Sequence, residues 1–209
     1  LTDTQSHFDT VSLTFHHLHQ QFGDDVVVVK GNVLDEDTSI LKSLLGALSE
    51  TFNVDIGVQQ SQPSLSEGGL LVMDMDSTVI GIECIDEIAK LADVGQEVAE
   101  VTEKAMRGEI AFNESLHHRV ACLKGVPVEH LRQIRDSLPI MPGIQGLLSE
   151  LKKHNWKLAI ASGCFTYFAD HLKRRLELDY ATSNTLVIEN GLLTGKVEGE
   201  VVNADVKAE

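Results

Sequence analysis

Two short apolar runs, far apart in the chain, constrain the fold more than any other feature of the sequence. Residues 70–73 are continuously apolar and lead into Asp74-Met75-Asp76, and residues 156–161 lead into Ser162-Gly163. Apolar runs of this length are typical of strands that are buried on both faces of a parallel sheet. Ligands bind such sheets beyond the carboxyl ends of the strands, so we expect both polar segments to meet at one edge.

The segment between the two runs has the periodicity of helices. We expect helices over residues 85–91, 98–106, 116–123 and 128–138, closed by Pro139 and Pro142, and a further helix over 143–154. Near the end of the chain, Asn190-Gly191 between two apolar segments predicts a β-hairpin. The sequence therefore predicts an α/β fold, a Rossmann-like parallel sheet with a helical cap inserted after the first strand.

The first 60 residues follow a different pattern. We expect a helix over 7–22, a strand over 26–29, a second helix over 40–48 and a strand over 54–58, which together make a small α+β region. A stretch rich in Ser, Gly and Pro follows. We therefore divide the chain into residues 1–60, a linker at 61–69 and a main domain at 70–209. The main domain has a core at 70–82 and 140–209 and a helical cap at 83–139.

Charge and composition exclude several classes of partner. The formal net charge of -15 disfavours nucleic acid and anionic membranes, which are themselves polyanions. No apolar run approaches the roughly 18 residues that cross a bilayer. The three cysteines, Cys84, Cys122 and Cys164, are widely spaced and form neither a metal-ligand spacing nor a disulfide framework. These features indicate a reducing, cytoplasmic compartment.

The paired carboxylates carry the first indication of chemistry. Side chains at i and i+2 of an extended chain point to the same side, so Asp74 and Asp76 repel unless they share a proton or a cation. Mg²⁺ prefers such oxygen ligands. Asp74 could then attack phosphorus while Asp76 exchanges a proton. A bare Asp-x-Asp pair would more often be a solvated turn, but the apolar run before it and Ser77-Thr78 after it favour the catalytic interpretation.

The same residues resemble a known superfamily. Residues 74–79 resemble the DxDxT-V signature of the haloacid dehalogenase-like phosphatases, and residues 160–163 resemble their second motif, a strand that ends in Ser-Gly. The resemblance to the phosphoserine phosphatase family is closer still and covers about residues 69–209. The segments that carry it are 83–89, 105–108, Phe112, 115–120, 190–195 and 197–199.

This resemblance assigns the reaction to five residues. It implies that Asp74 is the nucleophile and that Asp76 protonates the seryl oxygen and then activates water. It implies Mg²⁺ bound by the Asp74 carboxylate and the backbone carbonyl of Asp76. Ser162 and the Gly163 amide would hold phosphoryl oxygens, and Lys207 would neutralise phosphate charge and restrain the nucleophile. Without the resemblance, Lys207 would be an ordinary lysine of the chain end.

Four further residues are assigned to recognition of the substrate. The resemblance implies that Glu83 binds an ammonium group, that Arg119 binds a carboxylate, and that Met106 and Phe112 line the pocket of the cap. One acid and one base suit an amino acid better than a sugar, because the planar fork of Arg matches a carboxylate. Taken alone, Arg119 could equally be a surface residue of a helix.

The function implied by the resemblance is that of a phosphoric monoester hydrolase. It would convert the small molecule O-phosphoserine to serine and phosphate through an aspartyl-phosphate, the last step of serine biosynthesis. The superfamily's fourth motif, a Gly-Asp-Gly with a further Asp, is absent and would lie beyond Glu209. We therefore expect a chain that is truncated at both ends, with an incomplete metal shell and without activity as it stands.

Two other functions stay open at this point. One is a related phosphatase or phosphotransferase for another small phosphate ester, which Glu83 together with Arg119 would argue against. The other is an amino-acid-sensing module fused to an inactive catalytic fragment. The first 60 residues resemble part of an ACT-like regulatory domain by pattern alone, and a dimerisation module, and with it a homodimer, remains an alternative for them.

Overall fold

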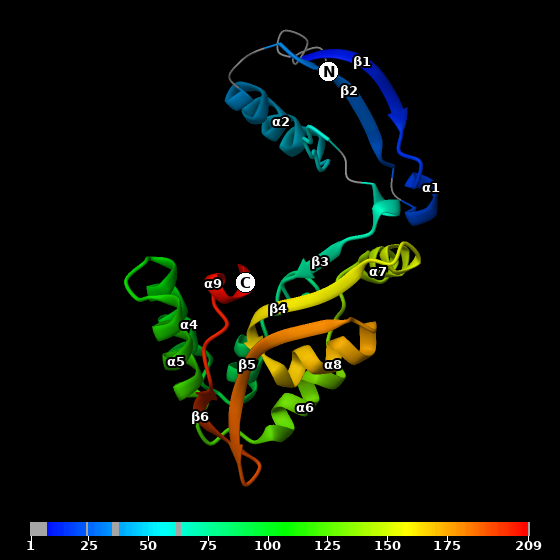
Figure 1. Ribbon diagram of the computed structural model, residues 1–209. Helices are drawn as coiled ribbons and strands as arrows, with labels where there is room; N and C mark the ends of the chain where they lie inside the picture. The colour runs from blue at the N-terminus through cyan, green and yellow to red at the C-terminus, as the bar shows by residue number, and fades with distance from the viewer. Residues whose placement is uncertain (1–7, 24, 35–37, 62–63, 209) are drawn as a thin grey trace. The chain divides into compact units, whose positions relative to one another are not determined.

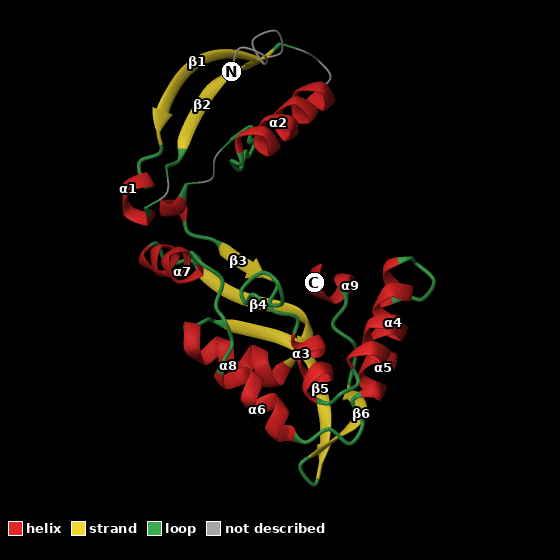
Figure 2. Cartoon of the chain, turned by 180° about the vertical axis from the view of Figure 1, so that it is seen from behind, coloured by secondary structure: helices red, strands yellow, loops and turns green. Residues whose placement is uncertain are grey.

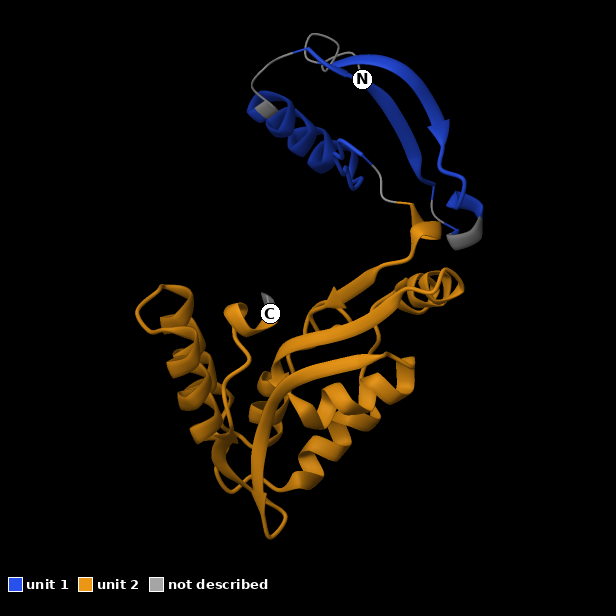
Figure 3. Ribbon diagram, viewed as in Figure 1, with its two compact units in different colours: residues 1–63 blue, residues 64–209 orange. Residues whose placement is uncertain are grey.

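The computed structural model divides the chain into two compact units. It describes residues 8–23, 25–34, 38–61 and 64–208. The first unit comprises residues 1–63 and the second residues 64–209, so the division falls inside the predicted linker (Figure 3). Residues 62–63 of that linker lie outside the described residues. Its end is a short 3-10 helix, Leu65–Glu67, and the indole of Trp156 donates a 2.8 Å hydrogen bond to the Leu65 carbonyl within the second unit.

The second unit is built on a four-stranded sheet in the order β3-β4-β5-β6 (Figure 1). Strands β3, β4 and β5 are parallel, and β6 is antiparallel to β5. Parallel neighbours need long crossover connections; helices α3 to α7 make the first and α8 makes the second. The strands are β3 (Leu70–Met73), β4 (Lys157–Phe165), β5 (Tyr180–Glu189) and β6 (Leu192–Glu198).

Helices cover the sheet and extend from it (Figure 2). Helix α6 packs beside α8, and α8 packs on β4 and β5. Helices α4 and α5 form a pair, and α5 packs on β6. The helices are α3 (Cys84–Leu91), α4 (Gly95–Met106), α5 (Phe112–Cys122), α6 (Val128–Asp136), α7 (Ile144–Lys153), α8 (Thr166–Leu176) and α9 (Ala204–Ala208). The α/β fold and the helices expected between the two apolar runs are confirmed. We call α3 to α6 and their connections, residues 83–139, the helical insertion.

The two apolar runs differ in burial. In β4, Leu158 and Ile160 are fully buried and Ala159 and Ala161 nearly so, as expected for a strand with neighbours on both sides. In β3, by contrast, Leu70 and Val72 are exposed while Met73 is buried. The prediction that β3 is buried on both faces is therefore wrong. The reason is its position at the edge of the sheet, where β4 is its one partner strand among the described residues.

The predicted hairpin is confirmed. Asn190 and Gly191 join β5 to β6 with φ angles of 51° and 77°. Two consecutive positive φ angles match the right-handed twist of the strands they join, and Asn-Gly is the sequence that adopts them most readily. The structure also adds α8, Thr166–Leu176, in a stretch for which we predicted no element.

The first unit corrects two predictions. Residues 7–22 are not one helix, because β1 (Phe8–Phe15) pairs antiparallel with β2 (Val27–Val33) and is followed by the short α1 (His19–Phe22). Apolar residues recur in β1 at both three- to four-residue and two-residue intervals, and pairing with the β-branched run of β2 favours the two-residue period. Helix α2, Thr38–Phe52, is present as expected.

The predicted strand over residues 54–58 is also absent. The N–H of Val54 donates to the Ser49 carbonyl at 3.1 Å, and the Ser49 hydroxyl donates to the Val54 carbonyl at 2.6 Å. Both backbone groups of Val54 therefore close the end of α2 instead of joining a strand ladder. Within the described parts of the chain, no helix is both long and apolar enough to cross a membrane.

Candidate active site

The loop that follows β3 presents the two carboxylates. Pairing of β3 with β4 runs to Met73 opposite Ile160, and the chain then turns at Met75, whose carbonyl accepts the N–H groups of Val79 at 2.9 Å and Ile80 at 3.0 Å. Met75 is fully buried between an exposed Asp74 and a half-buried Asp76. The tight turn around a buried methionine therefore fixes where both carboxylates lie.

Asp74 is paired with a lysine from the far end of the chain. The Nζ atom of Lys207 donates to Oδ2 of Asp74 at 2.8 Å, and the N–H of Met75 donates to Oδ1 at 2.8 Å. The two partners are 133 residues apart. A cation at this position offsets negative charge on the carboxylate and on any phosphate beside it. Among the predicted site residues, Asp74 and Lys207 are thus brought together.

Helix α9, labelled near the C-terminus in Figure 1, carries Lys207. Amide side chains hold it in place. Asn203 accepts the N–H groups of Asp205 at 3.0 Å and Val206 at 3.1 Å, which is the arrangement of an N-cap. Just before it, the N–H of Val202 donates to Oδ1 of Asn184 at 2.9 Å. The position of Lys207 is therefore tied back to strand β5.

Asn184 is a site residue that the sequence analysis missed. It is buried on β5, and its Nδ2 donates to the Gly163 carbonyl at 2.7 Å while its Oδ1 accepts from Val202. One side chain thus links the end of β4 to the segment that leads into α9. A buried polar residue in a strand is a possible signal, but burial at that position is not visible in the sequence.

Asp76 lies in a less solvated environment than Asp74. Its Oδ2 accepts the N–H of Cys84, the first residue of α3, at 3.0 Å. Its Oδ1 is buried and has no hydrogen-bond partner among the described residues. Burial raises the pKa of Asp76 to about 6, against the hydrogen bond from Cys84, which lowers it. A carboxyl group with this pKa can both give and take a proton near neutral pH.

Ser162 and Gly163 lie in an irregular part of β4. Regular pairing with β5 reaches Ala161 and resumes at Phe165, so the strand continues past the predicted end at Ser162-Gly163. Ser162 is buried, and its Oγ accepts the N–H of Cys164 at 3.1 Å. Because Met73 pairs with Ile160, this irregular segment and Asp74 leave the same edge of the sheet.

Phe112 of the helical insertion lies against Gly163. A Cβ atom at Gly163 would be 2.9 Å from Cζ of Phe112, so close that the ring would have to shift. The ring is nevertheless half exposed, because its other side faces solvent. The contact places the start of α5 directly over the end of β4, so the insertion closes on the strand ends at this point.

The other predicted recognition residues are less constrained. Glu83 accepts the Ser77 hydroxyl at 2.6 Å, which ties it to the loop after Asp76. Arg119 is half-buried on α5, and its Nε has no hydrogen-bond partner among the described residues. Met106 is 83% exposed at the end of α4. Its role in lining a pocket stays a prediction.

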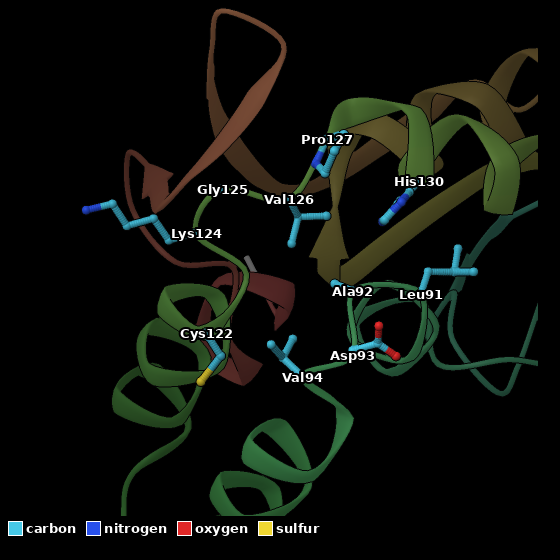
Figure 4. Close-up of a pocket in the computed structure, with 10 residues that line it drawn as sticks. All are labelled: Leu91, Ala92, Asp93, Val94, Cys122, Lys124, Gly125, Val126, Pro127 and His130. Carbon is cyan, nitrogen blue, oxygen red and sulfur yellow. The ribbon is translucent and has the colours of Figure 1, made fainter.

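A hollow elsewhere in the second unit contains none of the predicted site residues. It has a volume of about 330 Å³, and Figure 4 shows Lys124 extending away from the other lining residues. It lacks the paired carboxylates and the hydroxyl group found at the strand ends. We therefore place the candidate active site at the strand ends and not in this hollow. The lining residues are Leu91, Ala92, Asp93, Val94, Cys122, Lys124, Gly125, Val126, Pro127 and His130.

Similarity to known proteins covers most of the second unit. The family model of haloacid dehalogenase-like hydrolases matches residues 69–205. A phosphoserine phosphatase of Haemophilus influenzae is 58% identical over 155 residues, which are 74% of this chain and 49% of that protein. The chain thus spans about half the length of this curated relative.

Two solved structures extend the comparison. The unliganded crystal structure of a probable phosphoserine phosphatase from Vibrio cholerae matches with a TM-score of 0.69 and 45% identity, over 94% of this chain and 64% of that one. A phospho-aspartyl intermediate analogue of phosphoserine phosphatase matches with a TM-score of 0.59 and 39% identity, over 65% of this chain and 64% of that one.

Proposed function

The chain belongs to the haloacid dehalogenase-like hydrolases, and we propose that the protein hydrolyses O-phosphoserine to serine and inorganic phosphate. The observation that carries the proposal is the 2.8 Å contact between Lys207 and Asp74, beside an Asp76 whose pKa is raised to about 6. It supplies a nucleophile, a cation and an acid–base group at the end of one strand. Similarity to phosphoserine phosphatases supports the choice of substrate.

In the first step, an oxygen of Asp74 attacks the phosphorus atom and the bond from phosphorus to the seryl oxygen breaks. Asp76 gives its proton to that oxygen, and serine leaves. The phosphoryl group is then carried by Asp74, as in the relative solved as a phospho-aspartyl intermediate analogue. Lys207 offsets the charge that this transfer concentrates on oxygen.

In the second step, Asp76, now ionised, takes a proton from water. The water oxygen attacks phosphorus, the bond between phosphorus and Asp74 breaks, and phosphate leaves. In this proposal, Ser162 and the Gly163 amide hold phosphoryl oxygens through both steps. Because Asp76 acts first as an acid and then as a base, a pKa near 6 suits both roles.

A divalent cation fits the oxygen donors at this strand end. The Asp74 carboxylate is about half exposed, with a relative side-chain exposure of 48%, so an ion can reach it. We assign Mg²⁺ to this carboxylate and to the backbone carbonyl of Asp76, a set of hard oxygen ligands. When bound, Mg²⁺ would stabilise negative charge on the transferring phosphoryl group.

Recognition of the substrate is assigned to the helical insertion. Arg119 offers a planar fork for the carboxylate of phosphoserine, and Glu83 offers a negative charge for its ammonium group. Phe112, which packs on Gly163, and Met106 would cover the substrate. The three free cysteines agree with a reducing compartment such as the cytoplasm, where we place this last step of serine synthesis.

The proposal is tested by substrate selectivity in the intact protein with Mg²⁺. Phosphate release is measured from O-phospho-L-serine, from phosphoethanolamine, which lacks the carboxylate, and from 3-phosphooxypropionate, which lacks the ammonium group. We expect kcat/KM to be at least about tenfold higher for phosphoserine than for either analogue, because each lacks one charge-assisted contact. Equal values for all three would show that the substrate is another small phosphate ester.

A further inference from the structure

Two cysteines that are distant in sequence meet beside Asp76 in the structure. A side-chain oxygen of Asp76 and the sulfur atoms of Cys84 and Cys164 all lie within 4.8 Å of one another. Cys84 begins α3 and Cys164 lies on β4, so three separate segments supply the group. Both thiols are buried, at 0% and 8% relative exposure.

The cluster is polar although it lies in the core. Oδ1 of Asp76 is buried and has no hydrogen-bond partner among the described residues. A buried carboxylate oxygen without a hydrogen bond is unfavourable, because burial removes the water that would otherwise donate to it, and the two neighbouring thiols are weak donors. The Asp76 carboxylate and the two sulfur atoms supply one hard and two soft donor atoms close together, which is a set of ligands that Zn²⁺ accepts.

We propose that Asp76, Cys84 and Cys164 form a binding site for a thiophilic divalent cation, with Zn²⁺ as the ion that fits best. Zn²⁺ binds sulfur at about 2.3 Å and carboxylate oxygen at about 2.0–2.2 Å in a tetrahedron, so ligand atoms sit roughly 3.3–3.8 Å apart. From separations of at most 4.8 Å, the three atoms need to approach one another by at most about 1.5 Å to reach that geometry. Each thiol gives its proton to solvent as its bond to the metal forms, and water takes the fourth position.

This site differs in chemistry from the Mg²⁺ site assigned to Asp74. Mg²⁺ takes oxygen ligands and binds thiolates poorly, whereas Zn²⁺ binds them well. Asp76 belongs to both sites, through its carbonyl in one and through its carboxylate in the other. A carboxylate held by Zn²⁺ cannot exchange a proton. If the proposed phosphatase function holds, Zn²⁺ is therefore a reversible inhibitor that acts on Asp76 and not by displacing Mg²⁺.

Binding is tested with Co²⁺, a spectroscopic probe for such sites, in the intact protein with a phosphine reductant that keeps the thiols reduced. We expect one equivalent of Co²⁺ to produce thiolate-to-cobalt charge-transfer absorption and the intense visible bands of a tetrahedral ion. Zn²⁺ should remove both. Cys84→Ala and Cys164→Ala should each lose the charge-transfer absorption or reduce it by half or more.

Cys122→Ala is the matched control. Cys122 lies on α5, where its thiol donates to the His118 carbonyl at 3.3 Å, and it is not part of the cluster. This variant should bind Co²⁺ as the parent protein does. A parent protein without charge-transfer absorption would overturn the proposal, as would full absorption in Cys164→Ala or its loss in Cys122→Ala.

A second measurement uses the parent protein alone and therefore does not depend on whether a variant folds. X-ray absorption at the zinc edge of the parent protein with one equivalent of Zn²⁺ should show two sulfur neighbours at about 2.3 Å. A shell of oxygen and nitrogen atoms alone would overturn the site. This readout is independent of catalysis, so it remains valid if the protein fails to hydrolyse phosphoserine.

Inhibition is then measured at saturating Mg²⁺. We expect Zn²⁺ to inhibit phosphoserine hydrolysis, and the concentration for half inhibition to rise at least about tenfold in Cys164→Ala but not in Cys122→Ala, because a lost thiolate ligand weakens the site. Unchanged inhibition in Cys164→Ala would contradict the link between site and activity. Hydrolysis of phosphoserine without cobalt binding would refute the site alone, and cobalt binding without hydrolysis would refute the proposed function alone.

Discussion

The two halves of the candidate site are held in different ways. The strand-end group, Asp74, Asp76, Ser162, Gly163 and Lys207, is linked by short hydrogen bonds that lead back into the sheet. The proposed recognition group on the helical insertion is Glu83, Met106, Phe112 and Arg119. Met106 is largely exposed and Phe112 is about half exposed, and Nε of Arg119 has no hydrogen-bond partner among the described residues.

In the proposed function, different parts of the fold carry out phosphoryl transfer and substrate recognition. Groups that transfer a phosphoryl unit must be placed before the substrate arrives, and a sheet with a fixed register does this. Groups that recognise a substrate can gain their partners from the substrate itself, so a helical element with open contacts is sufficient. Asp76 lies where the two halves meet, because its carboxylate accepts the first N–H of α3.

The sharpest test of the strand-end group is Asp74→Asn. We expect no measurable phosphoserine turnover in the intact protein, because an amide cannot form the acyl-phosphate. Asp170→Asn, which changes an exposed aspartate on α8, should keep normal turnover. Phosphate release at saturating substrate is the measurement. Near-normal activity of Asp74→Asn would show that the covalent mechanism is wrong.

Lys207→Ala removes the cation from the same group. We expect kcat to fall by about 10²–10³-fold, as for loss of one donor that stabilises developing charge. Lys196→Ala on β6, an exposed lysine, is the control and should change kcat less than about twofold. If both variants behave alike, the contact between Lys207 and Asp74 has no role in catalysis.

Asp76→Asn tests the residue at which the two groups meet, and its effect is measured on the free energy of unfolding. Burial raises the pKa of Asp76 in the folded protein to about 6 from its ordinary value of 3.8, so the parent protein loses stability as the pH rises through this window. Asparagine cannot ionise. Relative to the parent, Asp76→Asn should therefore be more stable at pH 8 than at pH 4, by at most about 3 kcal/mol.

Urea unfolding with a chelator present, so that no cation binds the site, measures this difference. The decisive result is whether the stability of the variant relative to the parent rises or falls between pH 4 and pH 8. If the variant gains no stability relative to the parent between pH 4 and pH 8, ionisation of Asp76 does not destabilise the folded protein. The acid–base role assigned to Asp76 would then lose its support.

Arg119→Ala tests the recognition group and should have the smallest effect. We expect KM for phosphoserine to rise about 10- to 100-fold, because a charge-assisted bond contributes on the order of 1.5–3 kcal/mol. KM for an aryl phosphate, which has no carboxylate, should not change. Arg107→Ala, an exposed arginine after α4, serves as the control. Equal losses on both substrates would mean that Arg119 has a structural role.

The sequence by itself determined most elements of the second unit, although it gave no prediction for α8. Local pattern predicts the strands before Asp74 and Ser162, the helices between them and the Asn190-Gly191 turn. The reason is that the spacing of buried side chains in a helix or strand sets the spacing of apolar residues in the sequence. In the first unit, the prediction failed where few side chains are buried. In β1, Val11, Leu13 and Phe15 are all exposed, so two periods fit the segment equally well.

The tertiary structure alone decided which distant residues meet. The local periodicity of apolar residues predicts whether a side chain is buried, but it does not predict which distant residue that side chain contacts. Asn184 joins Gly163 to Val202, and widely spaced Cys84 and Cys164, which form no ligand motif in the sequence, converge on Asp76. These contacts exist because parallel strands bring their carboxyl ends to one edge, and the pairing of strands is a property of the folded chain.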